Sequence, residues 1–238
     1  MIEPPPAPLA VQIHADPDAL AAAAAAWIAR RARDAIEDRG RFLLAVSGGG
    51  TPLRMFHALR TVAIEWGRVH LVQVDERVAP EGSQQRNFTH LQSALLGHVP
   101  IPSGQVYPMP VLDTDLAAGA QRYNRRLVAL AGAPPVFDLV QLGLGEDGHL
   151  ASLVPGDPAL DIVDADVAAT APYQGHCRMT LTLPAIDRAR CILWLVAGAG
   201  KSAILARLVR SDQSIPAGRV RRSEALLMAD CAAAADLD

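Results

Sequence analysis

The 238-residue chain has few aromatic side chains, few cysteines and no excess of positive charge. Its 22 Lys and Arg against 25 Asp and Glu give a net charge of −3, which excludes the basic surface of general nucleic-acid binders. Cys177, Cys191 and Cys231 are odd in number and widely spaced, so neither a disulfide scaffold nor a cysteine-rich zinc module is expected. The histidines are scattered and form no close pair, so the sequence does not support a metal site.

Long hydrophobic runs are also absent from the sequence. The alanine-rich stretch from Ala19 to Ala29 stops at Arg30 and Arg31 and is too short to cross a membrane. The N-terminus, MIEPPPAPLA, lacks the positive start of a signal peptide. We therefore expect a cytoplasmic protein with no membrane partner.

Short apolar runs alternate with helical patterns along the chain. The runs are Phe42–Val46, Val69–Val74, Val136–Leu142 and Cys191–Val196. The helical patterns that follow them are Pro52–Leu59, Phe88–Leu96, a brief stretch near His149, and Lys201–Leu208. Two more helices, from Asp16 or Asp18 to Asp38 and at Asp113–Ala131, and a late strand at Leu226–Met228 complete the pattern. It predicts a Rossmann-like α/β fold with a mainly parallel sheet covered by helices on both faces.

We expect residues 1–16 to be an extended lead-in and residues 17–238 to form a single α/β domain. Ligands of open parallel sheets bind beyond the carboxyl ends of the strands. The loops that leave the four predicted strands are therefore the places to look for chemistry.

The first loop reads Ser47, Gly48, Gly49, Gly50, Thr51, Pro52. Its glycines let backbone N–H groups turn toward a ligand, and Thr51 with Pro52 would cap and open a helix whose positive end attracts anions. This favours a phosphate-binding loop over an ordinary tight turn. A nucleophile elbow centred on Ser47 is the less favoured alternative.

The second loop, Asp75-Glu76-Arg77, could place Arg77 against a phosphate or a developing negative charge, or be a solvated charged turn. The third, Gly143–His149, matches GxGxxG, but Glu146 and Asp147 would oppose a pyrophosphate and Pro155 interrupts the following helix. What remains is His149 beside Asp147, a plausible general base with an orienting carboxylate.

The fourth loop runs from Gly198 to Ser202 and is not a P-loop, because Leu195 stands where that motif needs glycine. Lys201 lies in the first turn of the predicted helix, where a cation opposes the helix dipole. Its position suggests an anionic ligand, although a solvent-facing lysine there is also common.

Taken together, these loops resemble the 6-phosphogluconolactonase family. The matching segments are SGGGTP at Ser47–Pro52, DERVAP at Asp75–Pro80, GLGEDGHLASLVPG at Gly143–Gly156, RMTLTLPAI at Arg178–Ile186, GAGKSAIL at Gly198–Leu205 and Pro216-Ala217. The resemblance implies hydrolysis of 6-phospho-D-glucono-1,5-lactone, a step of the oxidative pentose phosphate pathway, with neither metal nor other cofactor. It also implies a fold similar to that of glucosamine-6-phosphate deaminase.

The resemblance assigns roles to individual residues. His149 would be the base, oriented by Asp147, and Arg77 would meet the developing oxyanion or the phosphate. Asp75 would hold Arg77 or a sugar hydroxyl. The phosphate and the rest of the substrate would be bound by the Ser47–Thr51 backbone, Lys201, Arg178 and Asn87. Arg86 stands where the family usually has serine, and would add a phosphate contact or face solvent.

Two alternatives remain at this stage. A deaminase-like aldose–ketose isomerase is disfavoured because Val154 stands where the deaminase pattern has a catalytic glutamate. A non-catalytic sugar-phosphate-binding protein could have lost His149 or Asp147, yet both are present. The expected partner is a small phosphorylated sugar lactone, bound by a monomer or a weak homo-oligomer.

Overall fold

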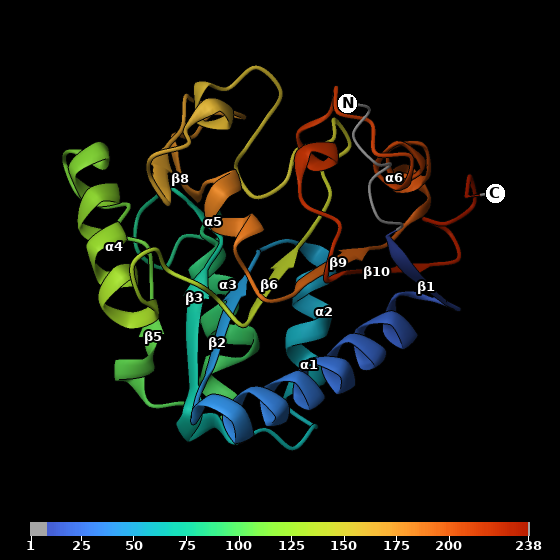
Figure 1. Ribbon diagram of the computed structural model, residues 1–238, viewed down its shortest axis with the longest axis horizontal. Helices are drawn as coiled ribbons and strands as arrows, with labels where there is room; N and C mark the ends of the chain where they lie inside the picture. The colour runs from blue at the N-terminus through green and yellow to red at the C-terminus, as the bar shows by residue number, and fades with distance from the viewer. Residues whose placement is uncertain (1–8, 238) are drawn as a thin grey trace, which may run out of the picture.

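Seven parallel strands form the main sheet of the computed structural model, which describes residues 9–237 (Figure 1). In spatial order they are β1 (Ala10–His14), β10 (Ala225–Asp230), β9 (Ile192–Val196), β6 (Leu139–Leu142), β2 (Phe42–Val46), β3 (Val69–Gln73) and β5 (Val106–Tyr107). Every pair of neighbours in this sheet runs parallel.

Helices cover both faces of the main sheet. Helices α1 (Pro17–Arg39), α2 (Gly50–Leu59) and α3 (Asn87–Ala94) enclose one apolar core, and α4 (Leu116–Ala131), α5 (Leu183–Asp187) and α6 (Ser202–Val209) enclose the other. Short 3₁₀ turns occur at Trp66–Arg68, Leu96–His98, Ser103–Gln105, Pro158–Asp161, Ala199–Lys201 and Pro216–Arg219. The predicted fold class is confirmed.

Helix α1 shows how local sequence sets an element. Asp16 accepts hydrogen bonds from the backbone N–H groups of Asp18 and Ala19, and Gly40 ends the helix in the left-handed conformation with φ 73°. Buried alanines, among them Ala24 and Ala25, let this helix pack closely against the sheet and α2.

The chain order reverses in the middle of the main sheet. From β2 the chain winds outward through β3 and β5, and it then returns to place β6 on the other side of β2. The loops that leave β2 and β6 therefore separate to opposite faces and open a crevice between them, the usual ligand site in sheets of this kind.

A second, antiparallel sheet lies beside the carboxyl end of the first and consists of β4 (Asp75–Arg77), β8 (Arg178–Leu181) and β7 (Val167–Ala169). The expectation that Asp75–Arg77 is a loop was wrong, because its backbone pairs with β8. Val74 joins the two sheets: its N–H donates to Val46, and its carbonyl accepts from Leu181.

Other boundaries also differ from the expectation. Residues Ala10–His14, expected within the lead-in, form the edge strand β1, while residues 1–8 lie outside the described part of the chain. The segment after His149 forms turns rather than a short helix. Strand β6 begins at Leu139 instead of Val136, because the backbone N–H of Val136 still closes a turn with Ala131.

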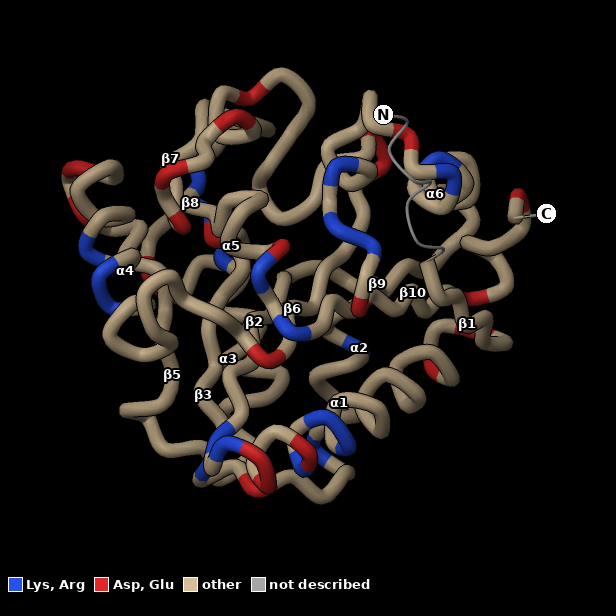
Figure 2. Tube along the Cα trace, viewed as in Figure 1, with Lys and Arg blue, Asp and Glu red and all other residues tan. Residues whose placement is uncertain are grey.

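Between residues 9 and 237, no helix combines the length and apolarity that a membrane span requires. Figure 2 shows Lys and Arg interspersed with Asp and Glu along the trace.

Candidate active site

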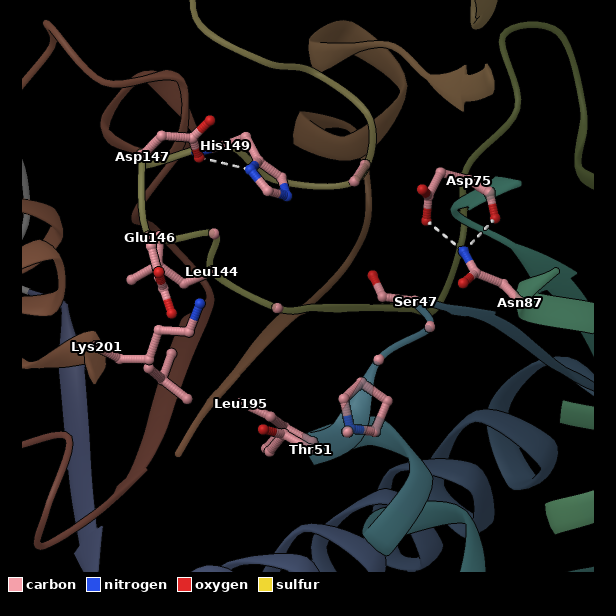
Figure 3. A pocket seen from close by; sticks show the side chains of 18 of the residues that line it. Ser47, Thr51, Asp75, Asn87, Leu144, Glu146, Asp147, His149, Leu195 and Lys201 are labelled. Atoms are coloured by element: carbon pink, nitrogen blue, oxygen red, sulfur yellow. Dashed lines mark hydrogen bonds and ion pairs between the residues drawn. The ribbon is translucent and has the colours of Figure 1, made fainter. Parts of the chain in front are cut away.

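A cavity of about 640 Å³ lies at the carboxyl ends of β2, β6 and β9, where the chain order reverses. All twelve candidate residues line it: Ser47, Gly48, Gly49, Gly50, Thr51, Asp75, Arg77, Asn87, Asp147, His149, Arg178 and Lys201. The structure thus brings together loop, strand and helix-terminal residues that are far apart in the sequence (Figure 3).

The glycine loop delivers the N-terminus of α2 to the cavity. Helix α2 begins at Gly50, and its N-cap is Gly49 with φ 110°, a conformation that side chains disfavour. Thr51 is therefore inside the first turn and is not the cap that we expected. No side chain caps this helix, so its first backbone N–H groups remain available to an anion.

Ser47 does not have the surroundings of a nucleophile. Its hydroxyl donates to the backbone carbonyl of Gln141 at 3.0 Å, and its N–H donates to the Gln141 side chain at 3.1 Å. A backbone carbonyl cannot act as a base, so this geometry argues against the nucleophile elbow.

Asn87 and Gly48 meet at very short range. A Cβ atom on Gly48 would lie 2.0 Å from Oδ1 of Asn87, so only glycine fits at position 48. The Asn87 amide donates to the backbone oxygen of Asp75 at 3.1 Å and to its Oδ1 at 3.2 Å. Within residues 9–237, Oδ1 of Asn87 is buried and has no hydrogen-bond partner.

Asp75 is almost fully buried at the cavity wall. Its Oδ2 accepts from the Ser152 hydroxyl at 2.6 Å and its Oδ1 from Asn87, so these residues rather than Arg77 hold it by hydrogen bonds. Burial raises the pKa of Asp75 above its usual value, although the Ser152 hydrogen bond lowers it in part.

Glu76, which sequence reasoning passed over, organises this wall. Its buried carboxylate accepts from the backbone N–H groups of Asn87 at 2.7 Å and Phe88 at 2.9 Å, at the start of α3. It also accepts from the N–H of Arg77 at 2.8 Å. Arg86 forms a buried ion pair with Glu76 at 3.4 Å, so it neither lines the cavity nor faces solvent, and both expectations for it were wrong.

Two arginines lie side by side in the small sheet. Arg77 in β4 is directly opposite Arg178 in β8. Burial lowers the pKa of Arg178 first of all, and the neighbouring charge of Arg77 lowers it further. In the described chain, Nε of each arginine is buried without a hydrogen-bond partner. An anion in the cavity would relieve both the like-charge contact and the unmet donors.

His149 and Asp147 form a hydrogen-bonded pair. Nδ1 of His149 lies 2.5 Å from Oδ1 of Asp147, and Figure 3 shows the opposite ring nitrogen directed into the cavity. Gly145 makes room for the ring, because a Cβ there would lie 2.1 Å from Nδ1. Burial alone raises the pKa of Asp147, but hydrogen bonds and charge from His149, with the Tyr173 hydroxyl, leave it lowered overall.

Lys201 reaches the cavity from the side opposite Asp75 and Asn87 (Figure 3). It is the only lysine in the sequence and stands at the N-cap of α6. Figure 3 shows its ammonium group extending toward the part of the cavity that Glu146 also lines. No group of three or more His, Cys, Asp or Glu in the described residues could hold a metal ion.

Three further lining residues with polar side chains, Glu146, Tyr173 and Gln174, were not among the candidates. Glu146 entered the sequence argument only as an obstacle to pyrophosphate, while Tyr173 and Gln174 lie between β7 and β8 in a segment without a motif. A single tyrosine between two unrecognised strands carries no pattern that could have marked it.

Fold and site together define an α/β protein whose sheet has, at its reversal point, a cavity lined by cationic side chains, an uncapped helix N-terminus and a hydrogen-bonded Asp–His pair. The chain belongs to the glucosamine-6-phosphate isomerase/6-phosphogluconolactonase family, whose model matches residues 15–228. The predicted family is therefore confirmed.

Named relatives cover most of the chain. The 6-phosphogluconolactonase of Mycobacterium tuberculosis is 41% identical over 95% of this chain and 98% of its own length. That of Synechocystis is 38% identical over 76% of this chain and 77% of its own. The solved structure of 6-phosphogluconolactonase from Thermotoga maritima has a TM-score of 0.83 at 27% identity, covering 93% and 98% of the two chains. A monomeric glucosamine-6-phosphate deaminase, at 18% identity and a TM-score of 0.83, covers 96% of this chain and 100% of its own and shares the fold.

Proposed function

We propose that this chain is a carboxylic ester hydrolase that converts 6-phospho-D-glucono-1,5-lactone to 6-phospho-D-gluconate in the oxidative pentose phosphate pathway. The names of its relatives support this assignment. The observation that carries it is the Asp147–His149 pair, which shares one cavity with an uncapped helix N-terminus and three cationic side chains.

In this mechanism the ring nitrogen of His149 opposite Nδ1 takes a proton from water while the water oxygen attacks C1 of the lactone. Asp147 holds the opposite nitrogen and stabilises the imidazolium that forms. The C1–ring oxygen bond then breaks, and the proton returns to the ring oxygen. A base positioned in this way contributes about 10²–10⁴-fold to the rate.

Cations and backbone donors bind the charged parts of the substrate. The first N–H groups of α2, Lys201 and Arg178 hold the 6-phosphate. Arg77 stabilises the oxyanion that develops on the carbonyl oxygen, a role worth roughly 3–4 kcal/mol. Asp75, ordered by Asn87 and Ser152, accepts a hydrogen bond from a sugar hydroxyl.

The direct test follows the disappearance of freshly generated 6-phosphogluconolactone, with spontaneous opening subtracted. We expect catalysis by the wild type and its loss in His149→Ala. His98→Ala is the matched control, because His98 is exposed and outside the cavity. Full turnover by His149→Ala would contradict the assignment of the base, and an inactive wild type would contradict the function.

The phosphate site has a separate test. We expect Lys201→Ala to raise KM for the phosphorylated lactone and to leave the weaker hydrolysis of unphosphorylated gluconolactone unchanged. Reductive ¹³C-methylation labels a single side chain, because Lys201 is the only lysine, and inorganic phosphate should shift its NMR signal. An unchanged KM would argue against the anchor.

The deaminase-like aldose–ketose isomerase lacks support at the position where the deaminase pattern has its catalytic glutamate. Val154 is buried and does not line the cavity, so this position offers no acid–base group. Glucosamine 6-phosphate should therefore give no ammonia. Binding of 6-phosphogluconate without lactone turnover would instead favour a non-catalytic sugar-phosphate-binding protein.

We also propose a cytoplasmic location and a monomeric or weakly associating state. Cys177, Cys191 and Cys231 are all free, as is usual in a reducing compartment. Sedimentation equilibrium across a range of concentrations tests the oligomeric state.

A further inference from the structure

Tyr173 contacts both the Asp147–His149 pair and Arg178. Its hydroxyl donates to Oδ2 of Asp147 at 3.0 Å. Its ring meets the His149 ring edge-on, with centroids 5.6 Å apart. The guanidinium carbon of Arg178 lies 5.1 Å from the same tyrosine ring. One side chain therefore bridges the acid–base pair and a cation of the proposed phosphate site.

The tyrosine hydroxyl completes the hydrogen bonding of Asp147. Oδ1 of Asp147 serves His149, through Nδ1 at 2.5 Å and the backbone N–H at 3.1 Å, whereas Oδ2 is held by Tyr173. Two separate segments thus fix both carboxylate oxygens and prevent the group from rotating. The Asp147 side chain is 36% exposed, so without Tyr173 its free oxygen would be open to water.

The other contacts of Tyr173 hold Arg178. The Arg178 guanidinium lies over the ring, and its Nη2 lies 3.4 Å from the Tyr173 backbone oxygen and 3.4 Å from Oε1 of Gln174. The Tyr173–His176 bridge closes this segment against β8, where Arg178 begins the strand. The negative face of the aromatic ring attracts the cation stacked on it, which favours one orientation of the guanidinium.

We propose that Tyr173 is a positioning residue for lactone hydrolysis: its hydroxyl fixes Asp147 and thereby the His149 base, and its ring fixes Arg178 at the anion site. This inference rests on the proposed function. It assigns a different role to each part of the Tyr173 side chain: the hydroxyl acts on the chemical step, and the ring acts on substrate binding.

The two roles can be measured separately with two variants. Tyr173→Phe keeps the ring and should lower kcat on the order of tenfold, with little change in KM, because a hydrogen bond to a charged group is lost. Tyr173→Leu loses the ring as well and should raise KM in addition. Tyr107→Phe is the control, because the Tyr107 hydroxyl also contacts a histidine, His70 at 3.0 Å, and Tyr107 does not line the cavity.

The pH profile distinguishes positioning from simple folding defects. Without the tyrosine hydroxyl, Asp147 has one donor fewer and stabilises the protonated imidazole more strongly, so the acid limb of kcat/KM should move to higher pH. The other ionisable groups that line the cavity are Asp75, Arg77, Glu146, Arg178 and Lys201, and Tyr173→Phe leaves all of them in place.

A measurement without substrate separates this inference from the proposed function. The proton shared by Nδ1 of His149 and Asp147 should give a downfield NMR signal that is absent in His149→Ala. We expect Tyr173→Phe to shift or broaden that signal and Tyr107→Phe to leave it unchanged. An unchanged signal in Tyr173→Phe overturns the inference, whatever the wild type hydrolyses. With an active wild type, an unchanged kcat and acid limb in this variant also overturn it.

Discussion

Two glycines allow the polar side chains of the site to come together. Gly48 lies under the Asn87 amide and Gly145 under the His149 ring, and a Cβ on either would lie about 2 Å from the neighbouring side chain. Neither residue supplies a functional group, yet each determines where one can lie. Glycine in these loops therefore has a steric role besides exposing backbone donors.

Gly48→Ala tests this role. The added Cβ must displace Asn87 and break its hydrogen bonds to Asp75, so we expect kcat/KM to fall on the order of tenfold or more. Gly67→Ala is the control, because a Cβ there would meet nothing within 4 Å and Gly67 lies outside the cavity. Unimpaired lactone turnover by Gly48→Ala would show that Asn87 can move without consequence.

The sequence predicted the cavity lining well wherever a short motif followed an apolar strand. It did not reveal Glu76 as the residue that holds the start of α3, because a buried acid and a solvated acid look alike in a charged triplet. Tyr173 was missed for a related reason: its partner Asp147 lies 26 residues away in sequence, and only the fold brings them together.

Among the elements, apolar strands and capped helices were the most predictable. β2 has its predicted bounds, and α1 lies within about one residue of its expected start and end. The small sheet was not predicted, because β4 is a triplet of charged residues and β8 alternates Arg and Thr with apolar residues. Pairing between distant segments, and not local propensity, makes these strands.

The start of α1 offers a test at this scale. Asp16→Ala removes the acceptor for the N–H groups of Asp18 and Ala19, so the free energy of unfolding should fall by about 1 kcal/mol. Asp34→Ala, an exposed position inside the same helix, should change it by less than about 0.5 kcal/mol. Urea denaturation followed by circular dichroism measures both, and equal losses would refute the capping role.

At the scale of the whole molecule, two sheets meet at the cavity. The main sheet carries the glycine loop, His149 and Lys201, whereas the small sheet carries Arg77 and Arg178. Since Val74 belongs to both hydrogen-bond networks, the two halves of the site are connected directly through the backbone.

The buried carboxyl of Asp75 makes stability depend on pH. Its pKa is raised in the folded state, so the native protein binds the proton more tightly than the unfolded chain does. The free energy of unfolding therefore falls as pH rises through the folded pKa of Asp75. Asp75→Asn should therefore increase the free energy of unfolding at pH 7 by on the order of 1 kcal/mol and reduce activity. The gain should vanish in acid, where the wild-type carboxyl is protonated.

Denaturant titrations at several pH values provide the measurement. Asp164→Asn, at an exposed position, is the control and should alter stability little at any pH. A stability gain for Asp75→Asn that is the same at pH 7 and in acid would exclude the buried charge as its cause.

The parallel pairing of β1 with β10 has a consequence for synthesis, because Ala10 lies opposite Leu226. On the ribosome, about 200 residues separate the emergence of the two strands, or roughly 10–40 s at 5–20 residues per second. In the last part of that delay, while the roughly 30 residues between β9 and β10 are made, β9 presents an unpaired edge of five residues that are all buried in the native protein. A nascent chain stalled before β10 should therefore be a stronger chaperone substrate than one stalled after it.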